Sequence, residues 1–276
     1  MEILWFIELG TEDIFPPDCQ CNFFDFHGNI FYSFASVNKK ITTSTGKYGK
    51  TIYVYKINSI TGEHKEHFVD LCNDEKILLS NEWYFFSENG LILFTGIYLK
   101  ILEESVIILK DYFQNNVATK TLPFEYTFGN KIVKYNGIKT LSCLDRTNGK
   151  ELWKIKLNGY LYTKIEYKND DIIFGTSGGG SVLYTIELET GIIKRNDNNV
   201  MASNYSWYNN TIILPDKSGN IQIINPYKNE TIENYKIEYG KLFDYSPIKI
   251  YDDKIYTIVY KKNKGKWKGK IVCIKI

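Results

Sequence analysis

The sequence repeats one unit of short apolar strands separated by turns, and this repeat restricts the fold more than any other feature. In its clearest copy, strands at 131–135, 140–144 and 151–157 are separated by turns at 136–137 and 145–149. Short runs rich in Ile, Val, Tyr and Phe, bounded by Gly, Asn and Asp, are typical of β-strands joined by tight turns. Because no segment carries a long helical stripe, the pattern predicts an all-β chain built from repeated sheets.

The unit recurs on both sides of this copy. Its counterparts lie at 28–62, 90–109, 171–191, 211–229 and 254–274. The turns that precede the outermost strands fall near residues 58, 111, 145, 187 and 225, and a sixth falls just beyond 276. This spacing predicts six blades of four strands, and a seventh blade within 70–125 is the alternative.

The last copy stops at 270–274, where its outer strand should begin, and a matching strand stands at the other end of the chain. Leu4–Leu9 matches Leu152–Leu157 in four of six positions. If this segment supplies the outer strand of the last blade, the ring closes and no edge is left unpaired where the termini meet. The sequence therefore predicts a single β-propeller domain over 1–276, with about six four-stranded blades and a last blade closed by the N-terminal strand.

Cys143 and Cys273 occupy the same position of the repeat on a central strand, which predicts small buried core residues rather than reactive thiols. The chain has five cysteines, and this odd number fits reduced thiols. The N-terminus lacks a basic leader and a cleavage site, and no apolar stretch approaches the roughly 20 residues of a membrane span. We therefore expect a cytoplasmic protein without a membrane segment.

The turn and strand at 144–153 resemble the repeat of the pyrroloquinoline-quinone-like β-propellers. In that repeat, a Leu-Asp-x-x-Thr-Gly turn is followed by a Trp that packs between blades. Here Asn148 is an extra residue between Thr147 and Gly149, and Trp153 stands in the position of the packing Trp. The resemblance implies a fold only, because the calcium and quinone contacts of the dehydrogenases in that superfamily have no counterpart in this sequence.

Residues that could carry chemistry are few. His64 and His67 stand beside acidic residues, but residues three apart on a strand point to opposite faces and cannot hold one metal ion. The glycine-rich segment 175–181 leads into a strand rather than a helix, which favours a turn over a phosphate-binding loop. With no nucleophile elbow or triad signature, we expect no catalytic residue, no metal and no cofactor.

Charge and loop composition point to a partner surface instead. The formal net charge is +2, from 34 basic and 32 acidic residues, which disfavours nucleic acid and anionic membranes as main partners. Two loops that join second to third strands are long, at 35–50 and 261–270, and the latter holds six lysines and one Trp. The candidate partner-binding residues are Lys47, Tyr48, Tyr205, Trp207, Lys264, Lys266, Trp267 and Lys268. The alternatives are that the lysines only keep a hairpin soluble and that Trp207 and Tyr208 begin a core strand.

These features favour a non-catalytic, protein-binding propeller. Its most specific form is a bacterial immunity protein that binds an acidic surface of a cognate toxin and covers the active site. An enzyme or carbohydrate-binding propeller with a site at the central channel is the main alternative. Nucleic-acid binding through the basic loops is the weakest, because the net charge is close to neutral.

Overall fold

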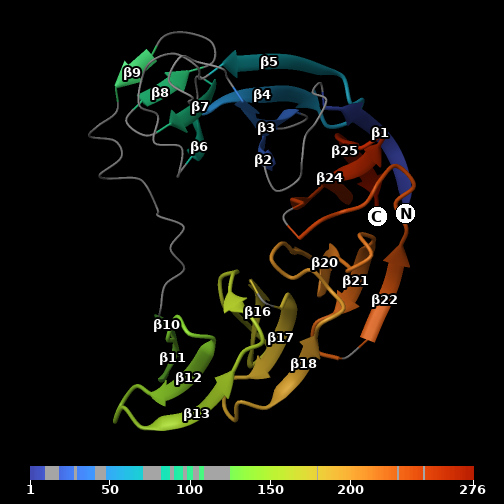
Figure 1. Ribbon diagram of the computed structural model, residues 1–276. Coiled ribbons are helices and arrows are strands. Elements are labelled where there is room, and N and C mark those ends of the chain that lie inside the picture. Colours follow the sequence, from blue (N-terminus) through green and yellow to red (C-terminus); the bar gives the residue numbers. More distant parts are fainter. Residues whose placement is uncertain are drawn as a thin grey trace. The chain divides into compact units, whose positions relative to one another are not determined.

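The computed structural model is all-β (Figure 1). It describes residues 1–9, 19–27, 30–40, 48–70, 82–87, 90–95, 98–101, 106–108, 125–178, 180–228, 230–244 and 246–276. Over these residues the chain forms strands, turns and bends but no helix, so none of them belongs to a helix that could cross a bilayer. The chain divides into two compact units, one made of Met1–Pro16 with Thr121–Ile276 and the other of Pro17–Lys120. The single domain over 1–276 stays a prediction.

The smaller unit contains two antiparallel four-stranded sheets. The first has the order β2 (Cys19–His27), β3 (Ile30–Lys40), β4 (Tyr48–Asn58) and β5 (His64–Asp70). The second has the order β6 (Glu82–Ser87), β7 (Gly90–Thr95), β8 (Tyr98–Ile101) and β9 (Val106–Ile108). The sequence placed the strand near 105–109 directly after 90–94, whereas β8 lies between them and β9 is the outer strand. β8 has only four residues, and a run this short is not recognised as a separate strand by pattern alone.

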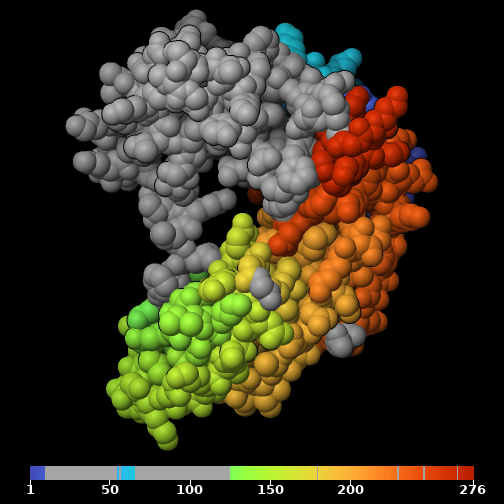
Figure 2. Space-filling model, in the orientation of Figure 1, coloured from blue at the N-terminus to red at the C-terminus, as the bar shows by residue number. Residues whose placement is uncertain are grey.

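The larger unit contains four sheets that follow one another along the chain. The first is β10 (Glu125–Phe128), β11 (Lys131–Tyr135), β12 (Thr140–Asp145) and β13 (Glu151–Lys156). In the second, β14 (Tyr160–Leu161) and β15 (Glu166–Lys168) both pair with β16 (Asp171–Ser177), followed by β17 (Val182–Glu187) and β18 (Ile193–Asp197). The third is β19 (Ser206–Tyr208), β20 (Thr211–Pro215), β21 (Ile221–Asn225) and β22 (Glu230–Tyr235). Figure 2 shows this unit as a continuous packed body, from green to red.

The fourth sheet joins the two ends of the chain. Its order is β23 (Ile248–Tyr251), β24 (Lys254–Asn263), β25 (Lys266–Lys275) and β1 (Glu2–Glu8). The two strands β1 and β25 are antiparallel, and their termini lie together in Figure 1. The N-terminal strand is therefore the outer strand of the C-terminal sheet, as the sequence predicts.

The register confirms the match between Leu4–Leu9 and Leu152–Leu157. Trp5 lies opposite Cys273, and Trp153 lies opposite Cys143. In both sheets the residue just before the Trp is the extra residue of a one-residue bulge. The strands β1 and β13, which are far apart in the sequence, therefore share residue types, register and the position of the bulge.

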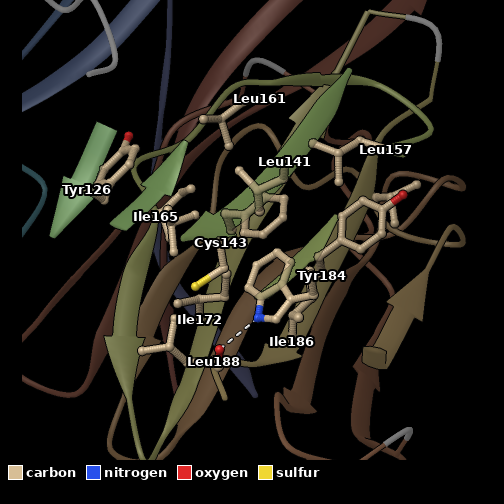
Figure 3. Close-up of a cluster of buried hydrophobic side chains, with 14 residues drawn as sticks. Tyr126, Leu141, Cys143, Leu157, Leu161, Ile165, Ile172, Tyr184, Ile186 and Leu188 are labelled. Carbon is tan, nitrogen blue, oxygen red and sulfur yellow. Dashed lines mark hydrogen bonds between the residues drawn. The ribbon is translucent and has the colours of Figure 1, made fainter. Parts of the chain in front are cut away.

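The faces of neighbouring sheets bury apolar side chains against each other. Figure 3 shows the cluster between the first two sheets of the larger unit, in which Val133, Leu141, Ile172 and Phe174 are fully buried. The indole nitrogen of Trp153 in this cluster donates to the carbonyl oxygen of Leu188 at 2.8 Å. This bond attaches the outer strand of one sheet to a turn of the next sheet, and it satisfies a buried donor.

The same strand position in the following sheet holds Arg195, whose side chain is also fully buried. Its guanidinium donates to the carbonyl oxygens of Asn225 at 2.9 Å and Lys228 at 2.6 Å. Trp153 and Arg195 thus perform one task with different chemistry, since each attaches its sheet to a turn of the following one.

Cys143 and Cys273 are fully buried, as predicted. Burial raises the pKa of each thiol to about 11. Both are therefore neutral core residues at physiological pH, with little thiolate to react.

Candidate functional site

The hairpin of β24 and β25 extends beyond the sheet to which it belongs. The β23 strand pairs with β24 no further than Ile248 with Thr257, and β1 pairs with β25 no further than Glu8 with Lys270. Pairing between β24 and β25 continues to Asn263 with Lys266. We call residues 261–268, the projecting end of this hairpin, the arm.

The arm corrects the expectation of a long loop at 261–270. Only Lys264 and Gly265 lie between the strands, with φ of 48° and 84°. A two-residue turn with positive φ at both positions matches the right-handed twist of paired strands, and Gly supplies one of the two positions without steric cost. Lysine has low strand propensity, so the strands here are imposed by the turn and by their continuation from the sheet.

The lysines of the arm lie on a paired backbone, and the charge of one of them, Lys268, helps to lower the pKa of the Glu8 carboxyl. Lys261 lies directly opposite Lys268 across the two strands, and like charges in this position destabilise a strand pair. The side chains of Lys261, Lys262, Lys264 and Lys268 are exposed, and none of them forms an ion pair with any residue that the structure describes. The base of the arm differs, because Lys270 bonds to Glu8 at 3.0 Å and lowers the pKa of that carboxyl.

Trp267 is half-buried and pairs with Lys262 in the middle of the arm. Its ring packs edge-on against Phe243, with centroids 5.2 Å apart and planes at 76°. Phe243 packs against Tyr260 in the same way at 5.6 Å, and the Lys241 ammonium lies 4.9 Å from the Phe243 ring centroid. Backbone hydrogen bonds of 3.0 and 2.9 Å tie Lys241 to Tyr260. Trp267 thus braces the arm against the segment before β23.

Tyr205 and Trp207 have a different setting. The Tyr205 hydroxyl donates to one carboxylate oxygen of Glu166 at 3.0 Å, and the Trp207 indole donates to the other at 2.7 Å. Both rings pack on a buried apolar cluster, and burial, with the Glu166 charge second, raises the pKa of Tyr205. Trp207 lies in β19, which fits the alternative that it begins a core strand. These contacts hold β15 to β19 and do not include the arm.

The remaining predicted residues are less fully described. Tyr48 is the first residue of β4 in the smaller unit, where it pairs with Lys40. Lys266 is the first residue of β25. Lys47 and the side chains of Tyr48 and Lys266 lie outside the described residues.

A polar network beside the arm was not foreseen. The carboxylate of Asp244 accepts hydrogen bonds from Ser177 Oγ at 3.0 Å and Ser181 Oγ at 3.2 Å. Its backbone oxygen accepts from Ser203 Oγ and from Asn204 Nδ2. The network joins the β16–β17 turn to the segments before β19 and β23. Since Asp244 directly follows Phe243, these three segments and the base of the arm share one end of the sheets.

The structure adds no sign of a metal centre in the part of the chain that it describes. Within those residues, no three His, Cys, Asp or Glu side chains come together as a metal site would require. His64 and His67 both lie on β5, which is the outer strand that the sequence predicts there. The strands β16 and β17 pair antiparallel as far as Thr176 with Val182, so the glycine-rich segment joins two strands and not a strand to a helix, as expected.

No protein-family model matches the sequence, and no curated protein matches it. Among solved structures, BamB from Moraxella catarrhalis is similar over 98% of this chain and 99% of that chain, with 10% identity and a TM-score of 0.42. The computationally designed Ika4 protein is similar over 56% of this chain and 94% of that chain, with 11% identity and a TM-score of 0.35. Hsv2 from Kluyveromyces lactis is similar over 91% of this chain and 84% of that chain, with 11% identity and a TM-score of 0.33. Because these values are low, nothing that these proteins bind is carried over to this chain.

Proposed function

We propose that the chain is a non-catalytic, protein-binding β-propeller of six four-stranded blades that holds an acidic protein surface with its arm. The observation that carries the proposal is the set of exposed arm lysines without ion partners among the described residues.

The propeller is supported by what the sheets of the larger unit share. Each outer strand has a one-residue bulge at the same place, and the next residue is Trp153, Arg195, Glu233 or Trp5. Two of these side chains bond to a turn of the following sheet, so the unit propagates from sheet to sheet by one repeated contact. A six-bladed ring closed by β1 continues this repeat around the whole chain.

The arm lowers the stability of the folded state, and this cost supports a binding role for it. Placing Lys261 opposite Lys268 forgoes roughly 0.2–1 kcal/mol that an opposite-charge pair at the same position contributes. Local rules of this kind are broken mostly where function requires it. The paired backbone also limits the conformational entropy lost when a partner docks, in contrast to a flexible loop. An acidic surface is the complement of this arrangement, and it would be attracted over about 8 Å at physiological ionic strength.

The most specific form of the proposal is a cytoplasmic immunity protein whose arm covers the active site of an acidic toxin. Occlusion needs shape and charge complementarity and no catalytic residue. Co-expression tests this form, because a toxin encoded beside the gene should be neutralised by the native chain and not by an arm variant. A neighbouring gene set for metabolism would contradict the immunity form and leave the acidic-surface proposal standing.

The general proposal is tested with poly-glutamate as the acidic probe. In the arm variant, Lys261, Lys262 and Lys268 become Gln and Lys264 becomes Asn, which tolerates positive φ. In the matched control, four exposed lysines away from the arm, Lys150, Lys154, Lys228 and Lys249, become Gln. Calorimetry should show at least a tenfold loss of affinity for the arm variant and little change for the control. Equal losses in both would refute the proposal, since non-specific charge would then explain binding.

A further inference from the structure

We infer a second contact for the same acidic partner on the first two sheets of the larger unit, at the end of the sheets where the arm lies, and this inference rests on the proposed function. The contact is made by Lys139, Lys156, Tyr160, Tyr162 and Lys164, which we call the tyrosine patch. Tyr160 and Tyr162 are exposed by 49% and 55%, among the most exposed large hydrophobic side chains in the described part of the chain.

The patch is a built surface rather than a flexible loop. Tyr160 belongs to β14 and pairs with Ser177 on β16. Its ring lies against Gly178, where a Cβ would come within 3.0 Å of it. The Lys139 ammonium lies 4.7 Å from the centroid of the same ring, a cation–π arrangement. Lys139 itself is held by its backbone oxygen, which accepts a hydrogen bond from Leu157 at 2.7 Å.

The patch and the arm are far apart in the sequence, but a chain of contacts connects them in the structure. Ser177, the strand partner of Tyr160, donates to Asp244, and the neighbouring Phe243 packs against Trp267. The turn between β20 and β21 lies at this end too, because the carbonyl oxygen of Gly219 accepts a hydrogen bond from the Leu242 amide at 2.9 Å. Patch and arm therefore lie at the same end of the sheets, and the Asp244 network lies between them.

Several lysines lie at the arm end of this unit, although the net charge of the whole chain is only +2. The arm end carries the arm, the three patch lysines, Lys217 and Lys241. Three carboxylates at the arm end have partners, because Glu8 forms an ion pair with Lys270 and the carboxylates of Asp216 and Asp244 accept hydrogen bonds. The turns at the opposite end carry Asp145, Asp170, Glu187, Glu189, Asp252 and Asp253, and Glu187, Glu189 and Asp252 pair there with Lys194, Lys131 and Lys254. Carboxylates thus have partners at both ends of the unit.

The chemistry of the patch favours an acidic polypeptide over a nucleic acid. Lys139 already covers one face of the Tyr160 ring, so a base can stack there only by displacing it. The Lys139 ammonium over the exposed Tyr160 ring instead offers a carboxylate a charged donor, and the tyrosine hydroxyl offers a neutral one. Tyrosines of this kind are also enriched where protein partners bind most strongly.

The test compares a short oligo-glutamate, of about six residues and ~20 Å in extended length, with a long poly-glutamate. The native chain should bind the long probe at least tenfold more tightly than the short one, because the second contact becomes intramolecular. The patch variant combines Lys139→Asn, Tyr160→Ser and Tyr162→Ser, and it should lose this gain while keeping its affinity for the short probe. Its control combines Lys150→Gln with Tyr167→Ser, since Tyr167 is 46% exposed but lies away from the patch.

The outcomes separate the two claims. If the patch variant keeps the full gain while the arm variant loses binding, the tyrosine patch is refuted and the proposed function stands. If the arm variant binds both probes like the native chain, the proposed function itself is refuted. Tighter binding of an oligothymidylate of equal charge would overturn the choice of an acidic polypeptide. Circular dichroism and thermal melting of every variant verify that it is folded.

Discussion

The pairing of β1 with β25 makes a sharp prediction for two residues of one strand. Ile7 is 3% exposed and lies opposite Ile271, whereas Leu4 is the extra residue of the bulge and is 40% exposed. Ile7→Ala and Leu4→Ala remove the same number of atoms from the same strand. The difference between them therefore reports mainly burial, since strand propensity contributes at most ~1 kcal/mol.

The expected magnitude follows from these exposures. Truncation of a buried Ile to Ala costs about 2–5 kcal/mol, from lost transfer free energy and the cavity left behind. We expect about 3 kcal/mol for Ile7→Ala and under about 1 kcal/mol for Leu4→Ala. In a chain of this size the former lowers the melting temperature by roughly 6–12 °C.

Urea unfolding followed by circular dichroism measures both values. Equal and small effects would refute the reasoning, because β1 would then not be docked on β25. A larger effect for Leu4→Ala would refute the register instead, since a slip by one residue exchanges the two faces of a strand.

Three further outcomes are expected. Lys261→Glu should raise the free energy of unfolding by roughly 0.2–1 kcal/mol in urea while weakening poly-glutamate binding, because it turns a like-charge strand pair into an attractive one. Trp153→Phe should cost about 2 kcal/mol in the same assay, because the Leu188 carbonyl oxygen loses its buried donor. Because burial raises the pKa of Cys143 and Cys273 to about 11, unfolding exposes thiols that ionise near pH 9, and stability is lost as pH rises above 9. The loss by pH 10 should be about 1.4 kcal/mol per thiol, and a variant with both cysteines changed to Ala should show a shallower decline between pH 8 and pH 10.

The repeated strands could be predicted because their signal is local. Strands such as β11 and β12 combine apolar runs with a turn of known chemistry, so the pattern suffices. The pairing of β1 with β25 was also predictable, though it joins opposite ends of the chain. It could be inferred because Trp5, Ile7 and Leu9 repeat the residues of an internal strand.

The candidate site could be predicted only in part. The lysines of the arm were recognised by composition. Their strand conformation was not, because lysine has low strand propensity and the strands form here only through pairing. The dipeptide Lys264-Gly265 was the one signal in the sequence for a tight hairpin turn at this place. Non-local contacts left no signal, because Asp244 meets Ser177 and Ser181 from 67 and 63 residues away.

Lysine footprinting tests the binding role of the arm most directly. The native chain is labelled with an amine-reactive reagent with and without poly-glutamate, and the modified lysines are quantified by mass spectrometry. We predict strong protection of Lys261, Lys262, Lys264 and Lys268, and unchanged labelling of Lys150. Protection spread evenly over the exposed lysines, or absent from the arm, would contradict the account.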